Sequence, residues 1–395
     1  MLFSSIPFLY YFLPLTLLCY FLAPRRAKNA VLLFFSLIFY AWGEPKYVLF
    51  MVASILQGYL FGRLVEKYRT KNPRRSKLFL TASVLFSLLL LGYCKYTDFF
   101  ISSVNAVTGL SIPLLRIALP IGISFYTFQI LSYVVDVSRG TVAAQRNLID
   151  LGTYIAMFPQ LIAGPIVRYA DIEPQLRERR STPEMIAAGT QRFVLGLAKK
   201  VLIANVLYQL ITTYKATTEP SVLFGWMYAV AYLLHIYFDF SGYSDMAIGL
   251  GRIFGFDFPE NFDYPYISAS ITEFWRRWHM SLGSWFRDYV YIPMGGNRVP
   301  PLRRYLNILV VWMLTGLWHG ADWNFVLWGL FFAVFLMLEK AFLLKPLQKL
   351  PVISHIYTLL LVTVSFVLFD SSRLSEAFLQ LGRMFGAGGV PLYTG

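Results

Sequence analysis

Residues 305–338 read YLNILVVWMLTGLWHGADWNFVLWGLFFAVFLML, two apolar stretches that flank a short polar segment around His319. A single helix over the whole stretch would exceed the ~20 residues that cross a bilayer. Gly316 and Gly320 bracket His319, and Asp322 can cap the start of a second helix. Irregular backbone at membrane depth is tolerated only where protein buries it or water borders it. We therefore predict an interrupted membrane helix with His319 at the break, where an ionisable side chain is a candidate functional group.

The composition of the whole chain, like this stretch, indicates a membrane protein. Of its 395 residues, 57% are hydrophobic, 18% aromatic and 14% charged, and the mean hydropathy is +0.56. Soluble domains carry about 25% charged residues. The apolar runs are continuous rather than alternating, which favours helices over a transmembrane barrel. The sequence therefore predicts an all-α polytopic membrane protein, with one integral membrane domain over residues 1–395.

Positive charge is concentrated in short loops between the apolar runs, and the formal net charge is +14. Residues 63–77 form the most basic loop, and placing it in the cytoplasm puts the N-terminus outside. This pattern accounts for the basic balance without nucleic acid, and no aromatic and basic motif for nucleic acid accompanies it. Cys19 and Cys94 are isolated from any Cys/His cluster, so we predict neither a metal site nor a disulfide framework.

We expect about ten membrane-embedded segments. The N-terminal run lacks the basic region and cleavage site of a signal peptide, so we predict a retained first span. Proline and glycine within two of the runs, residues 112–135 and 148–167, predict broken or tilted helices packed in protein. The clearest of the other predicted segments are residues 47–61, 78–93, 201–211, 222–240 and 352–369.

An amphipathic helix should precede the interrupted one. Residues 270–273 read SITE and fit a capping box, and FWRRWHMSLGSWFRDYVY follows. Helical spacing would place a stripe of mainly aromatic side chains on one face of this helix, which suits a membrane interface or the wall of a funnel. The stripe comprises Trp275, Trp278, His279, Leu282, Trp285 and Phe286. His279 is therefore a second candidate, although an interfacial histidine packed among aromatic rings would give the same pattern.

A polar cluster follows the apolar run of residues 222–240, and we expect it either to support a site or to be purely architectural. Its members are Asp239, Ser241, Tyr243, Ser244 and Asp245. His235 and Asp239 are four residues apart and can pair on one helix face. Buried aspartates need partners, and the candidates are Arg252, Arg276, Arg277 or Arg287. GxSxG and GxxxxGK[ST] motifs are absent, which leaves a hydrolase serine and a P-loop unsupported.

Several stretches taken together resemble the membrane-bound O-acyltransferase (MBOAT) family. They are FYAWGEPKYVLF, ALPIGISFYTFQILSYVVDVSRG, FPQLIAGPIVRY, the run from Tyr237 to Arg298, and LTGLWHGADWNFVLWGL. The chain is most similar to the bacterial branch, which includes the alginate O-acetyltransferase membrane subunit. The resemblance implies a helical core around a central funnel or tunnel. It also matches His319 in LWHGADWN to the invariant histidine of the family and His279 in FWRRWHMSL to its second histidine.

The resemblance further implies an O-acetyltransferase in the bacterial inner membrane that acts on an extracytoplasmic polysaccharide. Acetyl-CoA would be the donor substrate, with no bound cofactor or metal, and an SGNH-type acetyltransferase would be the partner. His319 would be the general base, and His279 would orient the acceptor or stabilise the oxyanion. Trp318 and Trp323 would exclude water from the site. The residues expected to bind substrate or support the site are Trp318, Trp323, Asn324, Asp239, Asp245, Trp275 and Arg276.

Two other functions remain open from the residues alone. One is D-alanyl transfer to teichoic acid from a carrier protein, within the same family. The other is a transporter of lipid-linked sugar, in which broken helices and intramembrane charges would look similar. The identity of the polymer and the oligomeric state are open. Relatives usually continue past the segment that resembles residues 367–386, so we also expect a C-terminally truncated chain.

Overall fold

A computed structural model describes residues 2–43, 45–162 and 164–393. The described residues form mainly helices, and within them the only strand-like pairing is an isolated antiparallel bridge between Phe262 and Trp278. The predicted all-α class is confirmed. The chain folds into two compact units, residues 1–197 with 243–259, and residues 198–242 with 260–395. The one-domain organisation and the count of about ten embedded segments stay predictions.

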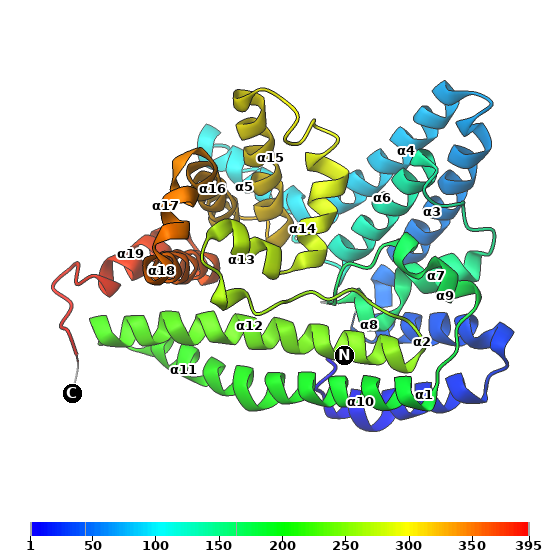
Figure 1. The fold of residues 1–395 in the computed structure, drawn as a ribbon, viewed down its shortest axis with the longest axis horizontal. Coiled ribbons are helices and arrows are strands. Elements are labelled where there is room, and N and C mark those ends of the chain that lie inside the picture. Colours follow the sequence, from blue (N-terminus) through cyan, green and yellow to red (C-terminus); the bar gives the residue numbers. More distant parts are fainter. Residues whose placement is uncertain (1, 44, 163, 394–395) are drawn as a thin grey trace. The chain divides into compact units, whose positions relative to one another are not determined.

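The first unit is built around α3, α4 and α6, which lie together (Figure 1). Its core is aromatic, with the rings of Phe8, Phe39 and Phe158 in mutual contact. Its α-helices are α1 (Leu13–Leu22), α2 (Lys28–Gly43), α3 (Val48–Arg69), α4 (Pro73–Leu91), α5 (Thr97–Thr108), α6 (Ile123–Arg139), α7 (Leu148–Ala156), α8 (Phe158–Leu161), α9 (Tyr169–Arg177) and α10 (Pro183–Ala198). The break predicted in residues 148–167 is confirmed, because α7 gives way to α8 at Met157. The prediction of a broken, packed helix over residues 112–135 is wrong for its first half, because residues 112–120 form no helix and are mostly exposed, and α6 begins only at Ile123.

The second unit contains both candidate histidines. A long helix, α12 (Val222–Ile253), contributes its N-terminal part to this unit. The remaining α-helices of the unit are α11 (Asn205–Ala216), α13 (Ile271–Arg277), α14 (Met280–Phe286), α15 (Pro301–His319), α16 (Trp323–Leu338), α17 (Leu344–Lys349), α18 (Pro351–Asp370) and α19 (Leu374–Met384). Its core joins Phe274 and Trp278 to Trp328, Phe332 and Phe366.

Within the described residues, six helical segments are long and apolar enough to cross a membrane. They are Pro45–Arg69, Pro73–Thr108, Pro183–Ala216, Val222–Ile253, Trp323–Lys349 and Pro351–Asp370. The predicted membrane protein is therefore confirmed by length and composition of the helices.

The stretch of residues 305–338 is not one interrupted helix but an antiparallel hairpin of α15 and α16, which pack side by side (Figure 1). Glycine permits this close approach. A Cβ on Gly316 would lie 2.2 Å from the carbonyl oxygen of Phe325, and one on Gly329 would lie 2.2 Å from that of Trp312. The predicted cap is confirmed, because the carboxylate of Asp322 accepts a 2.5 Å hydrogen bond from the first amide of α16.

The predicted amphipathic helix is also divided. Its cap is confirmed, because the Ser270 hydroxyl accepts a 3.0 Å hydrogen bond from the amide of Glu273. The helix then ends at Arg277, and α14 begins at Met280. The reason is contact with a distant segment: the Arg277 carbonyl accepts a 2.9 Å hydrogen bond from the amide of Asp263. The backbone between the two helices is therefore extended and then turned, not helical.

Candidate active site

His319 is the last residue of α15, at the bend of the hairpin, and it remains partly exposed. Three aromatic rings surround its imidazole. The ring centre of His319 lies 4.9 Å from that of Trp318, 5.1 Å from that of Trp328 and 5.3 Å from that of Phe369, each nearly perpendicular to it. This arrangement fixes the imidazole with apolar walls while leaving part of it accessible.

His279 lies between α13 and α14 and is almost completely buried, with 2% of its surface exposed. Its backbone adopts the left-handed conformation, with φ +46° and ψ +52°, which is uncommon outside glycine and is a strained state for a histidine. Its ring centre lies 4.7 Å from that of Phe240 and 5.8 Å from that of Trp318. Because Trp318 also contacts His319, one tryptophan links the two histidines.

Asn261 holds the turned segment in place. Its carbonyl oxygen accepts a hydrogen bond from the amide of Met280 at 3.0 Å, and its side-chain Oδ1 lies 3.0 Å from Nδ1 of His279. The opposite ring nitrogen, Nε2, is buried and makes no hydrogen bond within the described residues. Burial and, secondarily, the nearby His319 hold the pKa of His279 well below its usual value of 6.5. His279 is therefore a neutral imidazole at neutral pH.

Glu339 secures the start of α13. This carboxylate is 1% exposed and accepts hydrogen bonds from the amides of Ile271 and Thr272 at 2.7 and 2.8 Å, and from the Thr272 hydroxyl at 2.6 Å. A buried charge needs such partners. The sequence analysis missed this role, although an acid at the end of the apolar run of α16 is the signal that could have revealed it.

The partners predicted for the polar cluster are wrong. Asp245 binds Arg192 with contacts of 2.8 and 3.0 Å within the first unit. Asp239 pairs with Lys200 in the second unit, and not with His235. The imidazole of His235 instead lies 2.9 Å from the carbonyl oxygen of Ala204.

The four predicted arginines are also used elsewhere or stay apart from these aspartates. Arg252 pairs with Asp257, Arg287 with Asp288, and Arg277 with both Asp263 and Glu273. The physical reason for the error is that α10 and the helical turn after it, residues 199–204, present Arg192 and Lys200 to α12, a pairing that sequence spacing does not reveal.

The other predicted site residues fall at different places in the second unit. Trp275 packs against Trp328 and Phe332, with ring centres 5.5 and 4.8 Å apart, and so belongs to the aromatic wall behind His319. Asn324 is buried, and its amide donates a 2.7 Å hydrogen bond to the carbonyl of Ser371. Trp323 is half exposed at the start of α16.

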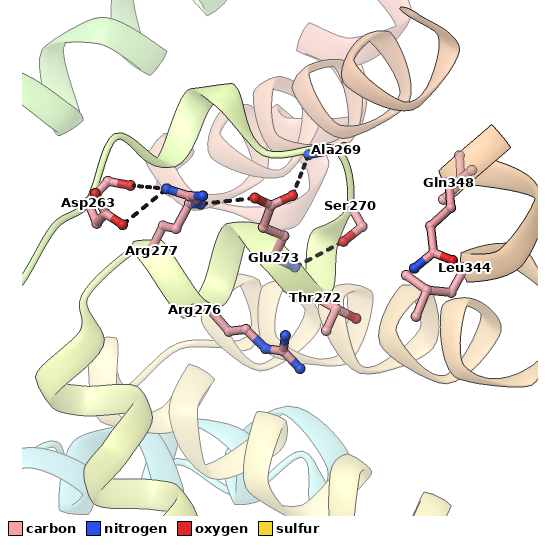
Figure 2. Close-up of a pocket in the computed structure, with 10 residues that line it drawn as sticks. Asp263, Ala269, Ser270, Thr272, Glu273, Arg276, Arg277, Leu344 and Gln348 are labelled. Atoms are coloured by element: carbon pink, nitrogen blue, oxygen red, sulfur yellow. Dashed lines mark hydrogen bonds and ion pairs between the residues drawn. The ribbon is translucent and has the colours of Figure 1, made fainter. Parts of the chain in front are cut away.

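Arg276 lines a separate cavity of about 480 Å³ between α13 and α17. Figure 2 shows Glu273 and Arg277 bonded to one another and to their neighbours, while Arg276 extends its guanidinium away from that network. Within the described residues Arg276 forms no ion pair, and its side chain is exposed. A free guanidinium in an open cavity can bind a phosphate or carboxylate with two parallel hydrogen bonds.

The arrangement around Trp318 suits proton transfer. Two imidazoles contact a common aromatic ring, one partly exposed and one buried with an unbonded Nε2. Neutral histidine can accept a proton from a hydroxyl group and return it to a leaving group. The residues missed by the sequence analysis, Trp328, Phe369 and Phe240, form the apolar walls, and their apolar surroundings in the sequence gave no local signal.

Comparisons with known proteins extend these observations. Residues 139–369 match the MBOAT, membrane-bound O-acyltransferase family. The chain is 43% identical over 395 residues to the probable alginate O-acetylase AlgI of Azotobacter vinelandii, an alignment that covers 98% of this chain and 79% of the relative. It is 33% identical over 429 residues to the peptidoglycan O-acetyltransferase of Helicobacter pylori, covering 99% and 81%.

A third relative is more distant. The chain is 31% identical over 227 residues to the teichoic acid D-alanyltransferase of Bacillus subtilis, covering 54% of this chain and 57% of the relative. The family match includes the helices that carry both histidines and the rings around them. This chain belongs to the membrane-bound O-acyltransferase family and is an O-acyltransferase that resides in a membrane.

Proposed function

We propose that this protein transfers an acetyl group from cytoplasmic acetyl-CoA, across the bacterial inner membrane, to hydroxyl groups of an extracytoplasmic polysaccharide. Two relatives support acetyl as the acyl group, since one is named an alginate O-acetylase and the other a peptidoglycan O-acetyltransferase. We propose an SGNH-type acetyltransferase as the partner that completes delivery to the polymer. Alginate is the first acceptor to test, because the relatives so named align over nearly the whole chain.

The observation that carries this proposal is the pair of imidazoles that both contact Trp318 and are walled by aromatic rings. Acyl transfer from a thioester to a hydroxyl requires a group that removes the hydroxyl proton during attack. His319 serves as this general base because, of the two histidines beside Trp318, only His319 remains partly exposed to an incoming substrate. The rings of Trp328 and Phe369 limit the access of water, which would otherwise hydrolyse the thioester.

The proposed acyl transfer uses His319 alone to move the proton, with no cofactor or metal. The acceptor hydroxyl oxygen attacks the thioester carbonyl carbon while its proton moves to His319. The tetrahedral intermediate then collapses, the carbon–sulfur bond breaks, and the thiolate leaves and takes the proton back from His319. Positioned proton transfer of this kind contributes roughly 10²–10⁴-fold to the rate.

The cavity beside Arg276 is the proposed contact for the donor. Coenzyme A carries phosphate groups, and a guanidinium binds phosphate through paired, charge-assisted hydrogen bonds. Arg276 is suited to this because no carboxylate in the described residues neutralises it, in contrast to Arg277 beside it. Thr272 and Gln348 line the same cavity and supply further polar contacts (Figure 2).

D-alanyl transfer from a carrier protein is the second candidate. It is considered because of the similarity to the teichoic acid D-alanyltransferase of Bacillus subtilis. That alignment covers about half of each chain, whereas those to the O-acetylating relatives cover at least three quarters. The donor therefore distinguishes the two functions.

The experiment is acetyl transfer across sealed vesicles. The protein and its candidate partner are incorporated together, labelled acetyl-CoA is supplied on the cytoplasmic side, and alginate or peptidoglycan on the other. We expect label on the partner or polymer with wild type and none with His319→Ala. Label from an aminoacyl carrier protein, but none from acetyl-CoA, would replace acetyl transfer with D-alanyl transfer. Equal label with wild type and a correctly inserted His319→Ala would refute the base assignment.

A further inference from the structure

The Asn261 side chain makes a set of contacts that fixes its own orientation. Its buried Oδ1 accepts a 2.8 Å hydrogen bond from the Ser281 hydroxyl and faces the Ser281 backbone amide at 3.4 Å. A backbone N–H can only donate. Rotating the Asn261 amide by half a turn would place its NH₂ group against that N–H, donor against donor, so oxygen must occupy this position.

The orientation of Asn261 in turn determines where His279 carries its proton. Nδ1 of His279 lies 3.0 Å from the same Oδ1. A bare Nδ1 would place two lone pairs against each other in a site from which water is excluded, which is unfavourable. The Ser281 hydroxyl does not offer an alternative donor, because it lies 3.5 Å from Nδ1 and 2.8 Å from Oδ1. Nδ1 therefore carries the hydrogen.

We infer that Asn261 is a positioning residue that holds His279 in its Nδ1–H form, so that the buried Nε2 accepts a hydrogen bond from an O–H or N–H group of a substrate. The identity of that substrate rests on the proposed function, but the proton position does not. Nε2 is buried, His279 as a whole is 2% exposed, and Nε2 has no hydrogen-bond partner among the described residues. A buried polar atom without a partner is rare and calls for one.

This assignment decides between the two roles that the sequence left open for His279. Stabilising an oxyanion requires a donor, and Nε2 in this form has none. Orienting a substrate group requires an acceptor, which Nε2 provides. The lowered pKa of His279 agrees with this role, because a neutral ring keeps the lone pair on Nε2. The substrate group is then either a hydroxyl of the acceptor that neighbours the attacking one or an amide of the donor's pantetheine arm.

The proton position can be measured without any activity. The chain has four histidines, so ¹⁵N-histidine labelling in nanodiscs gives a tractable spectrum. Each signal is assigned by its disappearance in a single His→Gln variant. We expect His279 to show a protonated Nδ1 and a bare Nε2 at neutral pH, and still at about pH 6.5, where an ordinary imidazole is half protonated. A protonated Nε2 in wild type would overturn the proposal, whatever reaction the protein catalyses.

Kinetics test the role of the acceptor nitrogen. Asn261→Leu removes the oxygen that holds Nδ1–H, and we expect kcat to fall by at least about 10²-fold. Asn261→Asp keeps an acceptor at this position and should preserve the Nδ1–H signal. The control for Asn261→Leu is Asn297→Leu, which removes the side-chain amide of an exposed asparagine and should leave kcat unchanged. A rise in KM for the polymer would place the bonded group on the acceptor, and a rise in KM for acetyl-CoA would place it on the donor. Unchanged kcat and KM in a folded Asn261→Leu would refute the role.

Discussion

Gly316→Ala should damage the enzyme although it adds only one methyl group, at a buried backbone position of α15. A Cβ on Gly316 would lie 2.2 Å from the backbone oxygen of Phe325, and real Cβ contacts are essentially never shorter than 3.0 Å. Because the obstacle is backbone, no rotamer change relieves it. The two helices of the hairpin must separate by about 0.8 Å at this point, the difference between those two distances.

The expected magnitude follows from this displacement. Alanine is favoured over glycine inside a helix by about 1 kcal/mol, but overpacking typically costs about 1–3 kcal/mol. We therefore expect a net destabilisation of up to about 2 kcal/mol. Gly316 lies one helical turn before His319, so the imidazole moves with it. A misplacement of about 1 Å can reduce the rate by about 10²-fold.

The assay compares Gly316→Ala with Gly92→Ala, another glycine in a helical segment, where an added Cβ meets no atom within 4 Å. Thermal unfolding in detergent and acetyl transfer in vesicles are measured for both variants. Gly92→Ala should keep the melting temperature and activity of wild type or gain slightly in stability. Wild-type melting and activity in Gly316→Ala would show that the helices separate freely and that the hairpin does not fix His319.

Three further outcomes follow from the site. His319→Gln should reduce acetyl transfer by roughly 10²–10⁴-fold. His355→Gln should retain activity, because among the described residues the His355 imidazole hydrogen-bonds only to the backbone carbonyls of Pro351 and Ile267. Asn261→Asp places a carboxylate beside His279. The other titratable group near His279 is His319. A carboxylate stabilises the charged imidazole and should raise the pKa of His279. Because activity needs neutral His279, the acidic limb of the pH–rate profile should move to higher pH. The control variant Asn297→Asp should leave that limb in place. Arg276→Ala should raise KM for acetyl-CoA by about tenfold or more, the loss of one charge-assisted contact of 1.5–3 kcal/mol, with Arg303→Ala, an exposed arginine outside the cavity, as the control. A pH profile or a KM that moves equally in variant and control would contradict these assignments.

Local features of the fold were predictable because they depend on neighbouring residues. Asp322 and Ser270 cap helices in the structure as their side-chain chemistry predicts. The break predicted in residues 148–167 is present between α7 and α8 at Met157, two residues before Pro159. These features follow from backbone preferences over a few residues, which sequence spacing records directly.

The conformation of His279 was not predictable because a distant residue imposes it. The stripe of aromatic residues keeps a helical period through position 279, so the local pattern favours one continuous helix. The break arises from hydrogen bonds to Asn261 and Asp263, which precede it by 18 and 14 residues. Neither residue carries a periodic signal. The same limit explains the wrong partners assigned to Asp239 and Asp245, which are held by cations from another helical segment.

The two histidines differ in their electrostatic surroundings in a way that assigns them different tasks. His319 ends a helix of 19 residues, and the C-terminal end of a helix dipole stabilises positive charge by about 0.3–2 kcal/mol. The charge that develops there as a base accepts a proton is therefore favoured. His279 is enclosed, and its amide partner provides no countercharge. Charging it would require desolvation without compensation. A buried neutral acceptor can hold a substrate group in place without competing for the proton that His319 takes during attack, so each histidine performs the task that the other is poorly placed to perform.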